Sequence, residues 1–335
     1  MSRILDALRS RLGFLLAANV VAAIVMTQLS PYFLTVGNGQ AMLQFGAVIA
    51  LLALGQTLVI VTGGGGIDLS VGSMLSLTSV LFGLMAVNAG IPLPVAAVLA
   101  VLAGAVLGAF NGILITGVGI PPIIATLGTL YLYGSLAVVM TDGVPISGFP
   151  DGFGFLGQRT LAGIPAQILL VVAPVALLLG WMVARTALGR SIYLVGVNEL
   201  AARLTGIAVN RTRIVVYALS GALAGLGAIV TTSWLMSARP DAGNGYELQA
   251  ITVAVLGGTN IMGGEGTLGG ALLAVLVVTM VGQGLQLANV DPTWQLGILG
   301  LLLLLAVMLN EFVLRRPARA PVDRDPPPAA KAAAA

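Results

Sequence analysis

The sequence has no cysteine and no histidine among its 335 residues, and only 8% of the residues are charged. Without these two residues there are no disulfides, no thiol chemistry, no usual zinc site and no imidazole base. The single lysine is Lys331, in a tail rich in alanine and proline, so a P-loop or Schiff-base lysine is also missing. Because a soluble domain devotes about a quarter of its residues to charge, a water-soluble enzyme is excluded.

The residues that are present are mostly apolar. Hydrophobic residues make up 58% of the chain, and glycine occurs 45 times, roughly twice its usual ~7% share. Transmembrane helices tolerate glycine and use it where two backbones approach closely. We therefore predict an all-α polytopic membrane protein that lies in a lipid bilayer and binds no nucleic acid.

The length of the apolar stretches predicts about ten transmembrane helices, because a helix needs about 20 apolar residues to cross the hydrocarbon core. The candidate spans are residues 12–30, 41–61, 69–88, 94–116, 121–140, 164–184, 214–236, 247–260, 267–287 and 294–312. The eighth is short and rich in glycine, so it could be broken or re-entrant, and eight or nine spans are also possible. The first is too long for the hydrophobic part of a signal peptide and has no cleavage site after it, which favours an uncleaved helix.

The placement of basic residues predicts that both termini are cytoplasmic. Three arginines precede the first span, and basic residues are enriched in cytoplasmic segments. Ten crossings then place 13 of the 15 basic residues inside and only Arg159 and Arg239 outside. We expect a transmembrane domain over residues 1–313 with a cytoplasmic loop at 185–213, followed by a disordered cytoplasmic tail at 314–335.

Two glycine-rich breaks interrupt the apolar runs. Their glycines and acids are Gly63, Gly64, Gly65, Gly66 and Asp68 in the first, and Gly257, Gly258, Gly263, Gly264 and Glu265 in the second. The first is no nucleotide loop, because no Gly-Lys-Ser/Thr follows it. Its aspartate could cap the next helix, or the break could be a hinge or gate. The second could serve close backbone packing, or supply the unwound helix ends from which transporters build binding sites.

Several amides and hydroxyls lie inside the predicted spans. Hydrogen bonds between helices would explain each of them, because an unpaired polar group is costly in lipid. Alternatively, five of them line a path for a neutral solute with many hydroxyl groups: Gln56, Asn111, Thr126, Thr129 and Thr252. No carboxylate or arginine clearly lies in mid-membrane, which argues against a proton relay or an ion path.

The loop 185–213 predicts a short capped helix over residues 199–205. Asn198 suits the N-cap, Glu199 and Arg203 are spaced for an i,i+4 ion pair, and Gly206 suits the C′ position. The whole element comprises Asn198, Glu199, Leu200, Ala201, Ala202, Arg203, Leu204, Thr205 and Gly206. Such an amphipathic helix fits a groove on a partner protein, or lies on anionic lipid.

Four segments together resemble a known family. They are GGGGIDLSVGSML at 63–75, GIPPIIATLGTL at 119–130, GRSIYLVGVNELAARLTGI at 189–207 and GYELQAITVAVLGGTNIMGGEGTLGG at 245–270. In this order they are similar to the membrane permeases of the ribose/xylose/arabinose-type ATP-binding-cassette importers, a group that includes the autoinducer-2 importer permeases. The resemblance runs from about residue 30 to 312.

The resemblance implies a fold of the vitamin-B12-importer type (type II) in the bacterial inner membrane. It implies a homodimer or heterodimer of permeases, two cytoplasmic ATPase subunits and a periplasmic sugar-binding protein. Residues 198–206 then correspond to the coupling helix that contacts the ATPase, and the turns 63–68 and 257–266 to parts of the gate. The solute would be a neutral pentose, hexose or deoxysugar, or autoinducer-2.

Three other functions are open from the sequence. A branched-chain amino-acid permease should have charged groups that meet a zwitterion, and an ion-coupled secondary transporter should have carboxylates inside the membrane. A purely structural subunit would not need the capped helix. We expect a non-catalytic membrane subunit, because the sequence has no P-loop lysine and ATP must therefore be hydrolysed on another chain.

Overall fold

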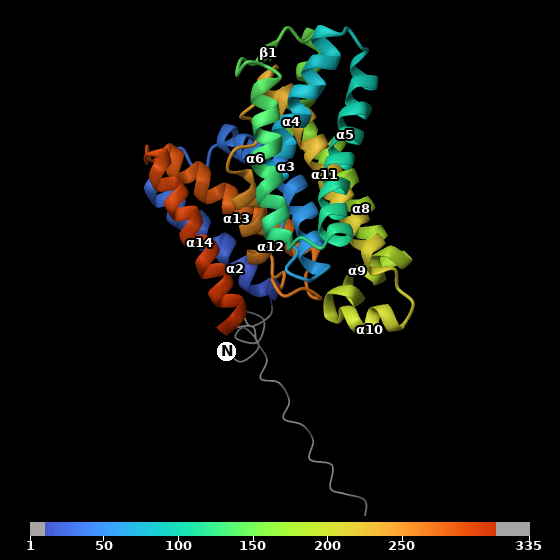
Figure 1. Ribbon diagram of the computed structural model, residues 1–335. Helices are drawn as coiled ribbons and strands as arrows, with labels where there is room; N and C mark the ends of the chain where they lie inside the picture. The colour runs from blue at the N-terminus through green and yellow to red at the C-terminus, as the bar shows by residue number, and fades with distance from the viewer. Residues whose placement is uncertain (1–10, 313–335) are drawn as a thin grey trace, which may run out of the picture.

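The computed structural model describes residues 11–312 as an elongated bundle of helices (Figure 1). Arg3, Arg9 and the predicted tail at 314–335 lie outside the described residues. The helices are α2 (Arg11–Leu29), α3 (Val36–Val61), α4 (Val71–Gly83), α5 (Leu93–Ile113), α6 (Pro122–Val139), α7 (Gly154–Gln158), α8 (Ala173–Arg185), α9 (Ala187–Val197), α10 (Glu199–Leu204), α11 (Val209–Leu235), α12 (Tyr246–Leu256), α13 (Leu268–Leu287) and α14 (Pro292–Phe312).

Four shorter helical pieces and four two-residue strands complete the described chain. The π-helical turns η1 (Leu84–Asn88), η2 (Leu114–Val118) and η4 (Ile168–Val172) extend α4, α5 and α8, and η3 (Asp151–Phe153) is a 3-10 turn. The strands are β1 (Ile146–Ser147), β2 (Thr160–Leu161), β3 (Ile164–Pro165) and β4 (Ser237–Ala238). The antiparallel pairs β1–β4 and β2–β3 were not predicted from the sequence.

All ten predicted spans are helical, but they are not all long enough to cross a membrane. Eight helical stretches among residues 11–312 have the length and hydropathy of a membrane span. In contrast, α12 has 11 residues, which at 1.5 Å per residue is about 16 Å, half of a hydrocarbon core of about 30 Å. The eighth segment is therefore short, as its glycines suggested, and α14, the tenth, is also not among the eight. The first count of ten was too high, and the alternative of eight that the sequence left open agrees with the described residues.

The chain nevertheless runs the length of the bundle around α12. Ala238 lies against Gly83 at the end of α4, whereas Gly243 donates its N–H to the Ser76 hydroxyl farther down the same helix (2.9 Å). After α12, the N–H of Gly264 reaches the carbonyl of Val61 at the end of α3 (2.9 Å). Non-helical backbone at this depth is tolerated only where protein covers it, and here α4 does so.

The connection at 185–213 is more helical than predicted. Thr186 caps α9 by accepting a hydrogen bond from the N–H of Gly189 (3.1 Å), and Ile192 and Val195 bury the inner side of this helix. After α10, α11 begins at Val209 rather than at the predicted 214, because the helix continues beyond the apolar run. Only a few residues of this segment are therefore loop.

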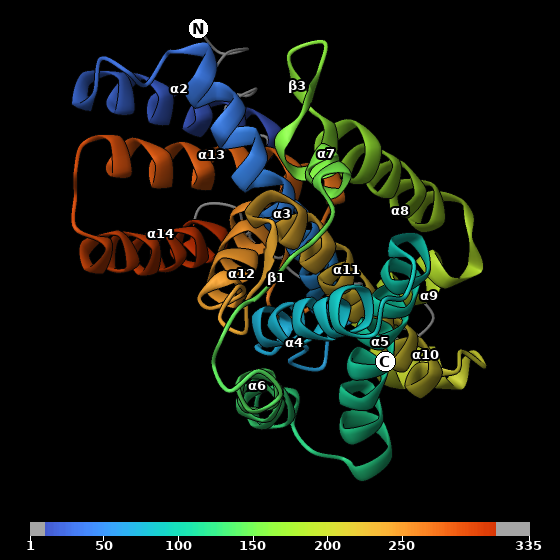
Figure 2. The same ribbon diagram turned by 90° about the horizontal axis from the view of Figure 1, so that it is seen from above.

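The core is built around α3 and α11, which lie in the centre of the bundle seen from above, with α2, α6, α8 and α14 on the outside (Figure 2). Every residue of α3 from Gly46 to Val61 is buried. On α8, Leu177 and Trp181 are 75% and 60% exposed. A core of small and aliphatic side chains under an exposed apolar surface is the arrangement expected of a bundle that faces lipid tails.

Glycines set the distance between α5 and α11. Gly104 and Gly108 lie one turn apart on α5, and Gly221 and Gly225 lie one turn apart on α11. A Cβ atom added at Gly221 would collide with the carbonyl oxygen of Gly104, and one added at Gly108 would collide with the carbonyl oxygen of Tyr217. The two helices therefore touch through their backbones, the arrangement that small residues four apart allow in membranes.

This packing predicts that Gly221→Leu pushes α5 and α11 apart and destabilises the protein by about 1–3 kcal/mol or more, the usual cost of overpacking. The matched control is Gly180→Leu on α8, where an added Cβ meets nothing within 4 Å. Thermal unfolding in detergent should show a lower midpoint for Gly221→Leu only. Equal midpoints for the two variants would contradict the packing argument.

Candidate functional site

The first glycine turn brings the chain back into the bundle after α3. Gly63, Gly64 and Gly65 have φ angles of 76°, 67° and 71°, a left-handed conformation that glycine adopts without strain. Gly64 and Gly65 are exposed, whereas Asp68, only three residues later, is completely buried. The turn therefore directs a carboxylate inward.

Asp68 does not cap α4 directly, which corrects one of the two interpretations of this aspartate. The N-cap of α4 is Ser70. The Asp68 Oδ1 atom accepts hydrogen bonds from the Ser70 N–H (2.9 Å) and the Ser70 hydroxyl (2.6 Å). An aspartate reaches the backbone two residues on because its side chain is short. Its other oxygen, Oδ2, has no hydrogen-bond partner among residues 11–312.

Three of the predicted pathway residues meet at this segment. With its amide nitrogen turned toward the Asp68 carbonyl, Gln56 pairs with both backbone groups of Asp68, each at 3.1 Å. Asn111 donates to the Ser70 hydroxyl (2.8 Å). Thr126 donates to the carbonyl of Ile67 (3.1 Å). Side chains from α3, α5 and α6 thus hold residues 67–70 in place.

The other two predicted pathway residues bond within their own helices. Thr129 donates to the carbonyl of Thr126 (3.2 Å), and Thr252 donates to the carbonyl of Leu248 in α12 (2.7 Å). All five pathway residues are buried in the single chain. Hydrogen bonds inside the bundle account for their positions, and contact with a solute stays a prediction.

Tyr133 belongs to this polar cluster and was not identified from the sequence. Its hydroxyl donates to the carbonyl of Leu107 (3.0 Å) and faces the Asn111 side-chain oxygen (3.4 Å). Helical spacing is the signal that would have found it, since Thr126, Thr129 and Tyr133 share one face of α6.

Burial controls the charge of Asp68. It lies in the connection between the spans Val36–Val61 and Val71–Asn88. Desolvation raises its pKa to about 6, although the hydrogen bonds from Ser70 work in the opposite direction. A carboxylate in this environment changes protonation state near neutral pH.

The second glycine turn lies beside the first. Gly258, Gly263 and Gly264 have φ angles of 88°, 95° and 77°, and the N–H of Asn260 closes the turn on the carbonyl of Glu265 (2.9 Å). The carboxylate-bearing residue Glu265 itself is exposed. At the start of the turn, a Cβ added at Gly257 would lie 2.6 Å from the backbone nitrogen of Ala271 in α13.

The capped helix predicted from the sequence is present as α10. Asn198 accepts the N–H of Ala201 (3.0 Å), and Gly206 has a φ of +83° directly after the C-cap. The helix ends at Leu204, one residue earlier than predicted. Glu199 and Arg203 form the predicted ion pair (2.8 Å).

A second arginine, which the sequence did not reveal, also binds Glu199. Arg213 at the start of α11 approaches the other carboxylate oxygen to 2.7 Å. Hydrogen bonds from Arg203 first, and then from Arg213, lower the pKa of Glu199. The acid therefore stays ionised and bridges α10 to α11.

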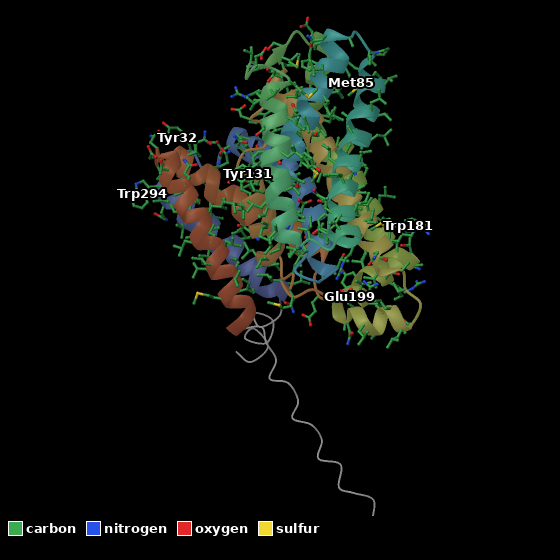
Figure 3. All side chains as sticks on the ribbon, in the orientation of Figure 1. Tyr32, Met85, Tyr131, Trp181, Glu199 and Trp294 are labelled. Carbon is green, nitrogen blue, oxygen red and sulfur yellow. The ribbon has the colours of Figure 1, made fainter. Side chains whose placement is uncertain are left out.

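The α10 helix presents leucines to the outside at one end of the molecule, where Figure 3 labels Glu199. Its inner residue Ala202 packs against Val195 and Val209. In contrast, Leu200 and Leu204 are 68% and 81% exposed. Apolar side chains that face outward from a charged segment mark an interaction surface.

The family described as "Branched-chain amino acid transport system / permease component" matches residues 40–307. The chain belongs to this permease family. It is a multi-pass membrane permease, the non-catalytic membrane component of an ATP-binding-cassette transporter whose partners include an ATPase and a binding protein. This confirms the family resemblance and the exclusion of a soluble enzyme.

Curated relatives cover nearly the whole permease. The ribose import permease protein of Escherichia coli K12 is 40% identical over 301 residues, 88% of this chain and 92% of the relative. The ribose import permease protein of Bacillus subtilis is 40% identical over 91% of this chain and 94% of the relative. An autoinducer 2 import system permease protein of Yersinia enterocolitica is 39% identical over 80% and 82%. No solved structure matches the chain.

The charge of Asp68 predicts a pH-dependent difference between wild type and Asp68→Asn. Because the pKa is raised from 3.8 to about 6 in the folded state, the wild type loses stability as the pH rises from about 4 through 6, by up to about 3 kcal/mol. The amide of the Asp68→Asn variant does not titrate, so any free-energy cost of burying it is the same at every pH.

The thermal midpoint of Asp68→Asn relative to wild type should therefore rise between pH 5 and pH 8 in detergent. Asp151→Asn, at an exposed position, is the matched control for removal of a carboxylate. A relative midpoint of Asp68→Asn that is the same at pH 5 and pH 8 would show that burial does not shift the pKa in this way.

Proposed function

We propose that this permease forms the inner-membrane path of a bacterial importer for a neutral monosaccharide, with ribose as the first candidate. The main support is that two proteins named as ribose import permeases are 40% identical to this chain over about nine-tenths of its length. Autoinducer 2 is the second candidate, because a relative with that name is 39% identical. The sugar is captured by a separate periplasmic binding protein.

We infer that the end of the molecule that carries α10 faces the cytoplasm. The arginines of segment 185–213 belong to this end, whereas Arg239 follows β4 at the opposite end, where β4 pairs with β1 (Figure 1). The first turn of α2 and the last turn of α14 also lie at the α10 end (Figure 1). The positive-inside rule supports this orientation and cytoplasmic termini.

In this proposal α10 is the coupling helix. Leu200 and Leu204 enter a groove on the ATPase, and the Asn198 cap and the packing of Ala202 keep the helix formed while it is pushed. Two permeases with a fold of the vitamin-B12-importer type enclose the path between them. Closure of the ATPase pair moves both α10 helices and opens the path alternately to each side, because ATPase contacts differ between the two states.

The gate and the remaining domain boundaries belong to the same proposal. The turns 63–68 and 257–266 close the path at the cytoplasmic end, where hydrogen bonding between Val61 and Gly264 brings them together. The permease domain extends over residues 1–313, and residues 314–335 form a cytoplasmic tail.

Uptake of radiolabelled solutes tests the function. A bacterial strain without its own ribose importer should accumulate ribose only when this permease is expressed together with its ATPase and binding protein. Parallel assays with autoinducer 2, glucose and leucine identify the solute class. Accumulation of leucine instead of a sugar, or accumulation without the ATPase, would contradict the proposal.

The role of α10 predicts that Leu200→Asp combined with Leu204→Asp lowers co-purification of the ATPase at least tenfold, because two charges replace the apolar contact. Val144→Asp is the control, since Val144 is equally apolar and 63% exposed but lies between α6 and β1. If α10 instead rests on anionic lipid, the double variant will keep its ATPase, and the coupling role will be wrong.

A further inference from the structure

Three separate segments of the chain meet backbone to backbone where α9 ends. A Cβ added at Gly196, in the last turn of α9, would collide with the carbonyl oxygen of Val61 and would lie 2.5 Å from the backbone nitrogen of Gly264. One added at Gly63 would lie 2.9 Å from the Cα atom of Gly196. We call Gly63, Gly196, Gly263 and Gly264 the glycine junction. It joins α9 to both glycine turns.

Hydrogen bonds fix the junction. The N–H of Gly264 donates to the carbonyl of Val61 (2.9 Å), which ties the second turn to the end of α3. The hydroxyl of Tyr193, one turn before Gly196 on α9, donates to the carbonyl of Gly266 (2.8 Å). With so little space and two bonds across it, α9 cannot shift without moving the second turn and the end of α3.

Arg213 makes a second connection from α10 to the first turn. Its guanidinium is 2.7 Å from the carboxylate of Glu199 and fills the space directly beside Gly64, where an added Cβ would collide with it. The side chain is 14% exposed, so it is held between the two elements rather than extended into solvent. A small cavity beside Gly63 and Gly66, also lined by Tyr217, leaves room on the inner side.

A single residue, Asn198, separates α9 from α10. It has an extended backbone (φ −159°, ψ 105°), and its side chain is fixed as the cap of α10. A displacement of α10 therefore passes directly into α9 through Asn198, and into α11 through Glu199 and Arg213. The route through α9 ends at both glycine turns, and the route through Arg213 ends at the first turn, beside Gly64.

We propose that Gly196 and Arg213 are positioning residues that transmit movement of α10 to the glycine turns 63–68 and 257–266. The proposal rests on the proposed coupling role of α10 and adds the route by which that helix acts on the gate. Gly196 transmits movement by close contact. If α9 were separated from the two turns by a gap, α9 could move without moving them. Arg213 transmits through its ion pair with Glu199 and its position directly beside Gly64.

The test compares transport with ATP hydrolysis in the purified complex of permease, ATPase and binding protein, reconstituted in vesicles with radiolabelled ribose. Arg213→Gln and Gly196→Ala should keep ATPase bound and hydrolysing within about twofold of wild type, while solute transported per ATP falls at least tenfold. Arg213→Lys should restore part of the loss, because it keeps the charge opposite Glu199 without the planar group beside Gly64.

Two matched controls separate this role from general damage. Arg211→Gln removes an exposed arginine two residues away, and Gly269→Ala fills open space on α13, where an added Cβ meets nothing within 4 Å. Both should transport as much solute per ATP as wild type. If Gly196→Ala does not fold, the arginine series decides.

Unchanged solute transport per ATP in Arg213→Gln would overturn the proposal. So would a parallel loss of ATP hydrolysis and transport, because that pattern indicates lost docking or folding rather than lost transmission. Failure of the proposed function is distinct from both outcomes: the wild-type permease would then not bind the ATPase, or would keep it in the Leu200→Asp, Leu204→Asp variant.

Discussion

This molecule depends on close contact between backbones, which is possible because glycine has no side chain. In lipid there is little hydrophobic force between helices, so their association relies on van der Waals contact and on hydrogen bonds. Gly104 and Gly221 allow this contact between α5 and α11, and Gly63, Gly196 and Gly264 allow it between α9 and the two non-helical turns. The same device thus supports both the rigid centre and the region proposed to move.

The second constraint is that polar groups buried in an apolar bundle need partners. Residues 67–70 leave the helical ladder, and their backbone and side-chain groups are bonded by Gln56, Asn111 and Thr126 from three helices. The cost of a break in α-helix at this depth is offset by these bonds. The exception is one Asp68 oxygen, which has no hydrogen-bond partner within residues 11–312. Desolvation by burial raises the pKa of this carboxyl group.

The sequence predicted those features that depend on local order. Hydropathy located ten helical segments, and the spacing of Asn198, Glu199, Arg203 and Gly206 located α10 with an error of one residue. Features that depend on contacts between distant segments could not be predicted from the sequence. Arg213 carries no local mark that it pairs with Glu199, and nothing near Gly196 in the sequence points to Val61.

The prediction for the eighth span shows the same limit in another form. A hydropathy window averages over residues 247–260, so it does not show where the helix ends. In the structure α12 ends at Leu256, and Gly257 lies against Ala271 of α13. The sequence shows the glycines, but only the fold shows which neighbour needs their space.

The energetics of α10 agree with a moving part. The ion pair within the helix joins Glu199 and Arg203, whose side chains are 38% and 47% exposed, and such a pair contributes no more than about 1 kcal/mol. The stability of the helix must therefore come from its Asn198 cap, worth about 1 kcal/mol, and from Ala202 packed against Val195 and Val209. Because the contact between Glu199 and Arg203 is weak, it can break and re-form during a transport cycle without loss of the helix. The glycine junction, in contrast, is held by close backbone contacts and by hydrogen bonds to Val61 and Gly266, so it is the stiffer of the two parts.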